Sequence, residues 1–200
     1  SFLETTGETT KKWLDSEFAS TGESTLRLRL AHTDEVATYV FVTANDNARR
    51  DPVTWTFREV LPSGETAVLH AVTEATPPQA RHALYAPFFL FAPPSPPLST
   101  PATPSPCLPS PPSPPPQPGF VSYEFSFQRA RLDTQAVDSI QLGAIALFDL
   151  RGSMLEIVSV ENPGGDNPRD QGPSKLIEYQ QVNAAVELGL VTATALRTTS

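Results

Sequence analysis

The 200 residues carry 14 Lys and Arg against 22 Asp and Glu, and the formal net charge is −8 at pH 7. The excess is spread over both parts of the chain, with 8 basic and 12 acidic residues in 1–92 and 6 and 10 in 119–200. Nucleic acids and anionic membranes both select clustered Lys and Arg, so neither is an expected partner. The longest apolar run, 85–93, is too short to span a bilayer, so we expect no direct membrane insertion.

The first part of the sequence predicts a series of short β-strands. Leucines alternate with polar residues in STLRLRL, and Val53, Trp55 and Phe57 alternate with polar residues in PVTWTFREV. The run VATYVFVT is almost wholly β-branched or aromatic, which suits a strand covered on both sides. The predicted strands are 24–30, 36–43, 52–60, 65–73 and 88–92.

A proline tract follows at 93–118 and holds 14 of the 22 prolines and no charged residue. Proline fixes φ and removes an amide donor, so polyproline II or disorder is expected there. A tether, a docking ligand and a glycosylated stalk are all compatible with this composition. The tract also holds the lone cysteine, Cys107, as an unpaired thiol or as a partner for a cysteine of another chain.

The remaining sequence predicts strands at 120–127 and 153–160 and a strand or strand pair at 137–149, whereas 179–200 mixes helical and strand patterns. In 120–127 apolar and polar residues alternate, so that Val121, Tyr123, Phe125 and Phe127 lie on one face. About eight short strands with turn signals between them predict an all-β fold, either a sandwich or a barrel.

Several phrases resemble the discoidin-like family, whose galactose-binding-like fold also forms the C-type domains of coagulation factors. They are TKKWLD, TANDNARRDPVTW, SIQLGAIALFDLRG and NPGGDNPRDQGPSKLIE, at 10–15, 43–55, 139–152 and 162–178. The resemblance implies a jelly-roll β-sandwich of about eight strands.

The order of these phrases is inverted relative to the family. Residues 1–92 match the back half of a module and 119–178 the front half, with 93–118 as a linker and 179–200 as a tail. The chain is then one circularly permuted module, or a window from a tandem array. Jelly-roll termini lie close together, so permutation is physically tolerable. A permuted module requires Lys175–Glu178 to lie beside Thr9–Asp15.

No motif supports catalysis, and we expect no enzymatic activity. The three histidines, His32, His70 and His82, are isolated, with no metal-ligand partner at i+2 to i+4. The sequence has no nucleophile elbow, phosphate-binding glycine loop or Cys/His cluster. No cofactor is predicted apart from a structural calcium ion.

The loop 161–178 has the oxygen-rich composition that calcium prefers. Carboxylates of Asp166 and Asp170, amides of Asn162 and Asn167, and backbone carbonyls could supply six to eight oxygens. Many discoidin-like modules carry a structural calcium near this region, although their Asp after KLI is Glu178 here. The sequence therefore predicts a calcium site, with a connecting turn as the alternative.

Candidate ligand contacts lie in loops that the fold is expected to place at its ends. In TANDNARRDP, Asn45, Asp46 and Arg50 face a ligand, or Arg50 pairs with Asp51 and pins the loop. The remaining candidates are His32, His82 and Tyr85. Trp13 and Trp55 suit the core better than a sugar-stacking platform.

Two functions follow from these features. The first is a non-catalytic structural or assembly subunit that docks to other protein chains in a larger complex. The alternative is a glycan- or ligand-binding, lectin-like module of a surface or extracellular protein. The single cysteine favours a reducing compartment. The composition of SPPSPPP is instead similar to that of the stalks of algal surface glycoproteins, so the localisation stays open.

Overall fold

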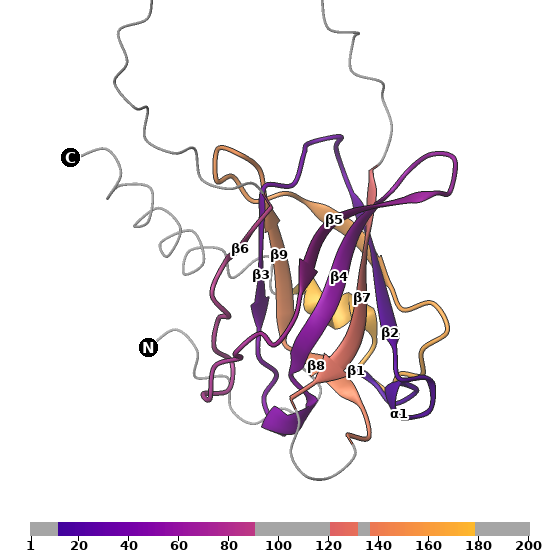
Figure 1. The fold of residues 1–200 in the computed structure, drawn as a ribbon, viewed down its shortest axis with the longest axis vertical. Helices are drawn as coiled ribbons and strands as arrows, with labels where there is room; N and C mark the ends of the chain where they lie inside the picture. The colour runs from indigo at the N-terminus through magenta and orange to yellow at the C-terminus, as the bar shows by residue number, and fades with distance from the viewer. Residues whose placement is uncertain (1–11, 91–120, 132–136, 179–200) are drawn as a thin grey trace, which may run out of the picture.

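The computed structural model describes residues 12–90, 121–131 and 137–178 (Figure 1). In these ranges a five-stranded sheet of order β10-β2-β7-β4-β5 packs on a three-stranded sheet of order β6-β3-β9, and β1 pairs with β8. All pairings are antiparallel. The predicted all-β sandwich is therefore confirmed. The predictions for the proline tract, Cys107 and the tail lie outside the described residues.

The strands agree closely with the alternation of the sequence. They are β1 (Trp13–Asp15), β2 (Ser24–Leu30), β3 (Thr38–Val42), β4 (Pro52–Val60), β5 (Thr66–Val72), β6 (Phe88–Phe89), β7 (Ser122–Ala130), β8 (Ile140–Leu142), β9 (Ala144–Phe148) and β10 (Ile157–Glu161). Short helices are α1 (Phe18–Thr21) and the 3-10 helices η1 (Ala48–Arg50) and η2 (Pro173–Leu176). The sequence analysis missed β1, which is three residues long and has no alternation to reveal it.

Of the two alternatives predicted for 137–149, the structure has the strand pair, β8 and β9, separated by Gly143. A Cβ atom at this glycine would lie 2.7 Å from the carbonyl oxygen of Thr43, which is closer than such atoms can approach. The glycine lets the chain pass close to the end of β3, where its amide donates to the carbonyl of Val42 at 2.8 Å. β8 can then pair with β1 while β9 pairs with β3.

Strands from the two parts of the chain alternate within the large sheet. β7, which comes from the second part, lies between β2 and β4 of the first part, and β10 pairs with the outer side of β2. The register places Phe125 opposite both Leu26 and Phe57. Neither part therefore contains a complete sheet of its own among the described residues.

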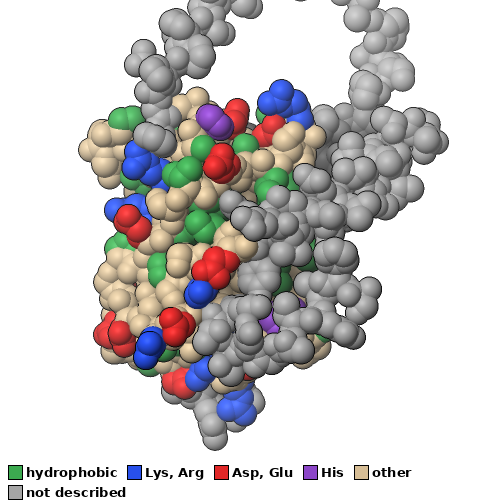
Figure 2. All heavy atoms as spheres, turned by 180° about the vertical axis from the view of Figure 1, so that it is seen from behind, with side chains coloured by type: hydrophobic (Ala, Val, Ile, Leu, Met, Phe, Trp, Pro, Cys, Tyr) green, Lys and Arg blue, Asp and Glu red, His purple; other side chains and the backbone are tan. Residues whose placement is uncertain are grey.

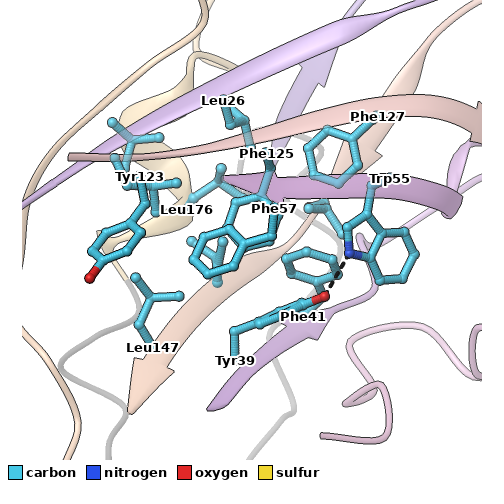
Figure 3. Close-up of a cluster of buried hydrophobic side chains, with 14 of the residues drawn as sticks. Leu26, Tyr39, Phe41, Trp55, Phe57, Tyr123, Phe125, Phe127, Leu147 and Leu176 are labelled. Carbon is cyan, nitrogen blue, oxygen red and sulfur yellow. Dashed lines mark hydrogen bonds between the residues drawn. The ribbon is translucent and has the colours of Figure 1, made fainter. Parts of the chain in front are cut away.

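Aromatic side chains fill the space between the two sheets (Figure 3). Trp55, Phe125 and Phe127 of the large sheet are at most 1% exposed, as are Tyr39 and Phe41 of the small one. Phe125 stacks on Phe57 at 4.3 Å and meets Tyr39 and Phe41 edge-on at 5.1 and 5.2 Å. Such offset and edge-on pairs stabilise a core beyond their burial alone. Trp13 is also buried, at 0% exposure. The core positions predicted for both tryptophans are therefore confirmed.

A series of hydrogen bonds between three side chains runs from this core to β5. The indole nitrogen of Trp55 donates to the hydroxyl of Tyr39 at 2.8 Å, and that hydroxyl lies 2.9 Å from Nδ1 of His70 on β5. All three groups are satisfied when Tyr39 in turn donates to an unprotonated Nδ1. Burial also lowers the pKa of His70. Both effects favour the neutral imidazole in the folded protein.

The stability of the fold is therefore expected to fall as the pH drops through the histidine range. Because the pKa of His70 is lowered in the folded state, the unfolded chain binds the proton more tightly. The neutral imidazole therefore contributes its full stability above the unfolded pKa of about 6.5, and this contribution is lost as the pH falls toward the lower folded pKa. Urea denaturation at neutral pH and at about pH 5 measures the loss. A His70→Phe variant should show a shallower pH dependence, and an equally steep dependence would contradict the assignment.

The two ends of the described chain meet beside β1. The amide of Leu14 donates to the carbonyl of Gln171 at 3.1 Å, and that of Ser16 donates to the carbonyl of Asp166 at 2.9 Å. The 3-10 helix η2 contacts β1 directly. The contact expected between the segment around Lys175 and the segment ending at Asp15 is therefore present in the described part of both segments.

Candidate functional site

The structure divides the predicted ligand residues between opposite ends of the sandwich. Asn45, Asp46, Arg50 and His82 lie near the loop that joins β3 to β4, where the amide of His82 donates to the carbonyl of Ala44 at 3.4 Å. His32 is exposed in the loop between β2 and β3, at the other end (Figure 1). These residues do not form one site.

Structural contacts already engage the charged members of the first group. The Lys12 ammonium lies 2.6 Å from both carboxylate oxygens of Asp46, and the Lys12 side chain is 3% exposed. Arg50 donates to the two carboxylate oxygens of Asp138 at 2.9 and 2.8 Å. The amide of Gln141 donates to the backbone carbonyls of Asp46 and Asn47 at 3.1 and 2.9 Å. These bonds fix the loop to its neighbours.

Asp51, rather than Arg50, is the centre of a buried ion-pair cluster in this region. Its carboxylate is 0% exposed and accepts two hydrogen bonds from Arg81, at 2.8 and 2.6 Å. Arg131 approaches it at 3.3 Å. Burial raises the pKa of Asp51, and the hydrogen bonds from Arg81 oppose that shift. The predicted Arg50–Asp51 pair is wrong, because Asp51 points inward while Arg50 lies on the surface with Asp138.

Tyr85 belongs to the core. It is 2% exposed, meets Phe41 edge-on at 5.7 Å, and donates through its hydroxyl to the carbonyl of Pro52 at 3.3 Å. A side chain so placed offers no surface to a ligand. His82, in contrast, is half-buried with a positive φ of 53°, and burial lowers its pKa together with the nearby charge of Arg81.

The oxygen-rich loop 161–172 lies against β1, and its side chains take separate partners. The Asp166 carboxylate accepts from the hydroxyl of Ser16 at 2.9 Å, and the amide of Asn167 donates to the carbonyl of Leu14 at 2.8 Å. Asp170 lies 3.7 Å from Arg169, and the Asn162 side chain packs against Gly165. No group of three or more His, Cys, Asp or Glu in the described residues could hold a metal ion. The arrangement fits a connecting turn better than a calcium shell.

Addition of calcium is therefore expected to leave the melting temperature unchanged relative to a chelator-treated sample. Three of the predicted ligands have separate partners, because Asp166 accepts from Ser16, Asn167 donates through its amide nitrogen to Leu14, and Asp170 lies beside Arg169. A thermal-shift titration of the full chain measures this directly. An increase in melting temperature that disappears in an Asp166→Asn, Asp170→Asn variant would instead establish the predicted site.

A buried carboxylate that the sequence analysis missed holds this junction together. Asp15 is 1% exposed and accepts from the backbone amides of Glu17 and Asp166 at 3.0 Å each, and from the hydroxyl of Ser24. It thus joins the start of the described chain to its last loop. The available signal in the sequence was its place as the last residue of the family-like phrase TKKWLD.

A small pocket opens at the end of the sandwich opposite the loop 43–51. Its volume is about 210 Å³, and its apolar lining comes from Val36, Leu69, Leu90 and Val121. Glu35, Glu59 and Tyr123 add polar groups. The sequence analysis did not single out Glu59. The available signal was that this charged residue follows Trp55 and Phe57 at the inward-facing positions of the same strand.

On the face shown in Figure 2, acidic and basic side chains are interspersed, and the described residues form no continuous basic patch there. No helix among the described residues has the length and apolar character needed to cross a bilayer. No protein-family model matches the chain, and no curated protein sequence matches it.

Proposed function

We propose that this protein is a non-catalytic structural or assembly subunit that docks to other protein chains in a larger complex. The observation that carries the proposal is an apolar edge formed by exposed side chains of both sheets. Val68 and Leu69 of β5 are 62% and 36% exposed, Phe89 of β6 is 49% exposed, and Leu84 is 43% exposed.

These residues lie on or beside the two edge strands that adjoin each other, with Leu69 toward the pocket and Leu84 toward the loop 43–51. The rings of His70 on β5 and Phe88 on β6 are 6.4 Å apart, so the edge strands of the two sheets are neighbours. Leu84 bridges to Val42 at the end of β3, on the side of that strand where β6 pairs. We call Val68, Leu69, Leu84 and Phe89 the apolar edge. Clustered apolar residues on a protein surface commonly mark an interaction site.

The edge strand β5 has only one of the usual protections against pairing, a β-bulge. Proteins blunt exposed edges with charges, prolines, bulges or very short strands. β5 is seven residues long, from Thr66 to Val72, and has no charged residue and no proline. Its one irregularity is a register shift opposite Phe57 and Arg58. Such an edge is suited to receive a strand from another chain.

We further propose that the sandwich is a jelly roll of the discoidin-like type in permuted order. The interleaving of β7 between β2 and β4 and the hydrogen bonds from the last loop to β1 support one module made from both parts of the chain. The lectin-like alternative has less support. Asp46 and Arg50 are held by Lys12 and Asp138, and Tyr85 is buried.

Site-specific cross-linking tests the assembly role. A Phe89→Cys substitution in a Cys107→Ser background places one thiol on the apolar edge, and Leu150→Cys, at a residue that is 71% exposed, places one elsewhere as a matched control. In the cells that make the protein, cross-links to other chains are expected from position 89 and not from position 150. Binding to a glycan array without cross-links from position 89 would favour the lectin-like alternative and contradict the proposal.

A further inference from the structure

The pocket at the end of the sandwich contains an unpaired carboxylate in a core-facing position. Glu59 is opposite Tyr123 on one neighbouring strand and Ala67 on the other, in phase with the buried Trp55 and Phe57. Among the described residues, no Lys, Arg or His lies within ion-pair distance of Glu59 or of Glu35. A carboxylate facing an apolar cavity is stabilised by a cation that enters it.

Three carboxylates at this end of the sandwich act on the Tyr123 phenol. Burial raises the pKa of Tyr123 to about 12, and the charges of Glu59, Glu35 and Asp34 add to the rise. A hydrogen bond with the backbone of Val36 acts in the opposite direction. The Tyr123 phenol therefore lies in the negative field of all three carboxylates, next to the apolar wall formed by residues such as Leu90 and Val121.

The pocket adjoins, through Leu69, the outer edge of β5, which pairs with no other strand among the described residues. In the register of β5 with β4, His70 is opposite Phe57 and Val68 is opposite Arg58, so Leu69 is an extra residue of a β-bulge. Bulges redirect side chains, and the Leu69 side chain lines the pocket. A strand that pairs with β5 would therefore pass beside the mouth of the pocket.

We propose that β5 receives an extended peptide segment of a partner chain by strand addition, and that a lysine or arginine of this segment enters the pocket between Glu35 and Glu59. The backbone edge supplies general affinity, and the adjacent pocket supplies the side-chain preference. A volume of about 210 Å³ is below the roughly 300–1,000 Å³ of sites for drug-sized ligands and suits one side chain. The apolar lining contacts the aliphatic stem while the carboxylates meet the charged end.

A second copy of the chain fits this site less well than a basic partner. β5 itself contains no Lys or Arg, and the nearest charged residues beyond its ends are Glu65 and Glu74. Pairing of two β5 edges would bring acidic groups together and leave both pockets without a cation. Charge complementarity therefore selects a partner with a basic residue in an otherwise uncharged strand.

Peptide titration of the full chain tests this inference, which rests on the proposed assembly role. The probes are short peptides that alternate threonine and valine, with either lysine or norleucine at the centre. The lysine peptide is expected to bind about tenfold more tightly, as two partly screened ion pairs allow. A Glu35→Gln, Glu59→Gln variant should lose this preference while retaining its far-UV spectrum. A Leu69→Lys variant should also lose the lysine preference, because its own ammonium occupies the pocket.

Three results would overturn the inference: equal affinity for the two peptides, an undiminished lysine preference in the double glutamine variant, or a dimer in sedimentation that Val68→Lys dissociates. The last would identify a second copy as the occupant. These results leave the assembly role standing if Phe89→Cys still cross-links to other chains. Loss of that cross-linking with the lysine preference intact would instead contradict the assembly role alone.

Discussion

Residues 12–90, produced without the rest of the chain, are expected to remain unfolded, and to fold when residues 121–178 are added. The first part lacks β7, the central strand between β2 and β4. It also lacks Phe125 and Phe127, which are 0% exposed in the core. Truncation of one buried Phe costs about 3–5 kcal/mol, so removal of a whole central strand exceeds the 5–15 kcal/mol that typically stabilises a domain.

Tryptophan fluorescence measures this complementation, because both tryptophans, Trp13 and Trp55, are in the first part and are at most 1% exposed in the sandwich. Emission should move to shorter wavelength only when the second part is present. The matched control is the full chain with a protease site placed in the tract 93–118, which should stay associated after cleavage. Cooperative unfolding of the first part alone would show that it is an independent domain and would contradict the single-module proposal.

Asp51→Ala is expected to destabilise the fold by about 3–5 kcal/mol, the cost of removing one partner of a buried ion pair. The substitution leaves Arg81 and Arg131 without their shared carboxylate, and their side chains are only 21% and 19% exposed. Chemical denaturation followed by circular dichroism gives the free energy of unfolding. The loss should appear as a lower midpoint at an unchanged slope.

Asp138→Ala provides the matched control. Asp138 also forms a two-bonded pair with an arginine, Arg50, but its side chain is 68% exposed. Exposed pairs contribute about 0.2–1 kcal/mol. Similar losses for the two variants would mean that burial does not distinguish the two pairs, and the structural role assigned to Asp51 would fail.

Much of the sandwich was predictable from local patterns. Alternation placed Leu26, Leu28 and Leu30 inward, and all three are at most 1% exposed. The predicted limits of β2 and β4 agree with the structure, whereas the predicted strand at 153–160 begins only at Ile157. The missed strand β1 depends on pairing with β8, which lies more than a hundred residues away. No local pattern reports such a partner.

The candidate sites were less predictable because residue type does not reveal a partner. Asp46, Arg50 and Asp170 have the composition of binding loops, yet each is paired with a side chain in the structure. Conversely, Glu59 looked like an ordinary charge in an alternating strand. Its place beside a pocket depends on β5 and β7 on either side and on the loop that contains Val36.

The sequence by itself determined the all-β class and which side of each main strand faces inward, because side-chain direction in a strand repeats every two residues. It also determined the acidic charge and the position of the proline tract. Only the tertiary structure decided the order of strands, the pairing of Asp51 with Arg81 and the pocket beside β5. These features join residues that are distant in the chain, and their geometry follows from packing of the whole sandwich.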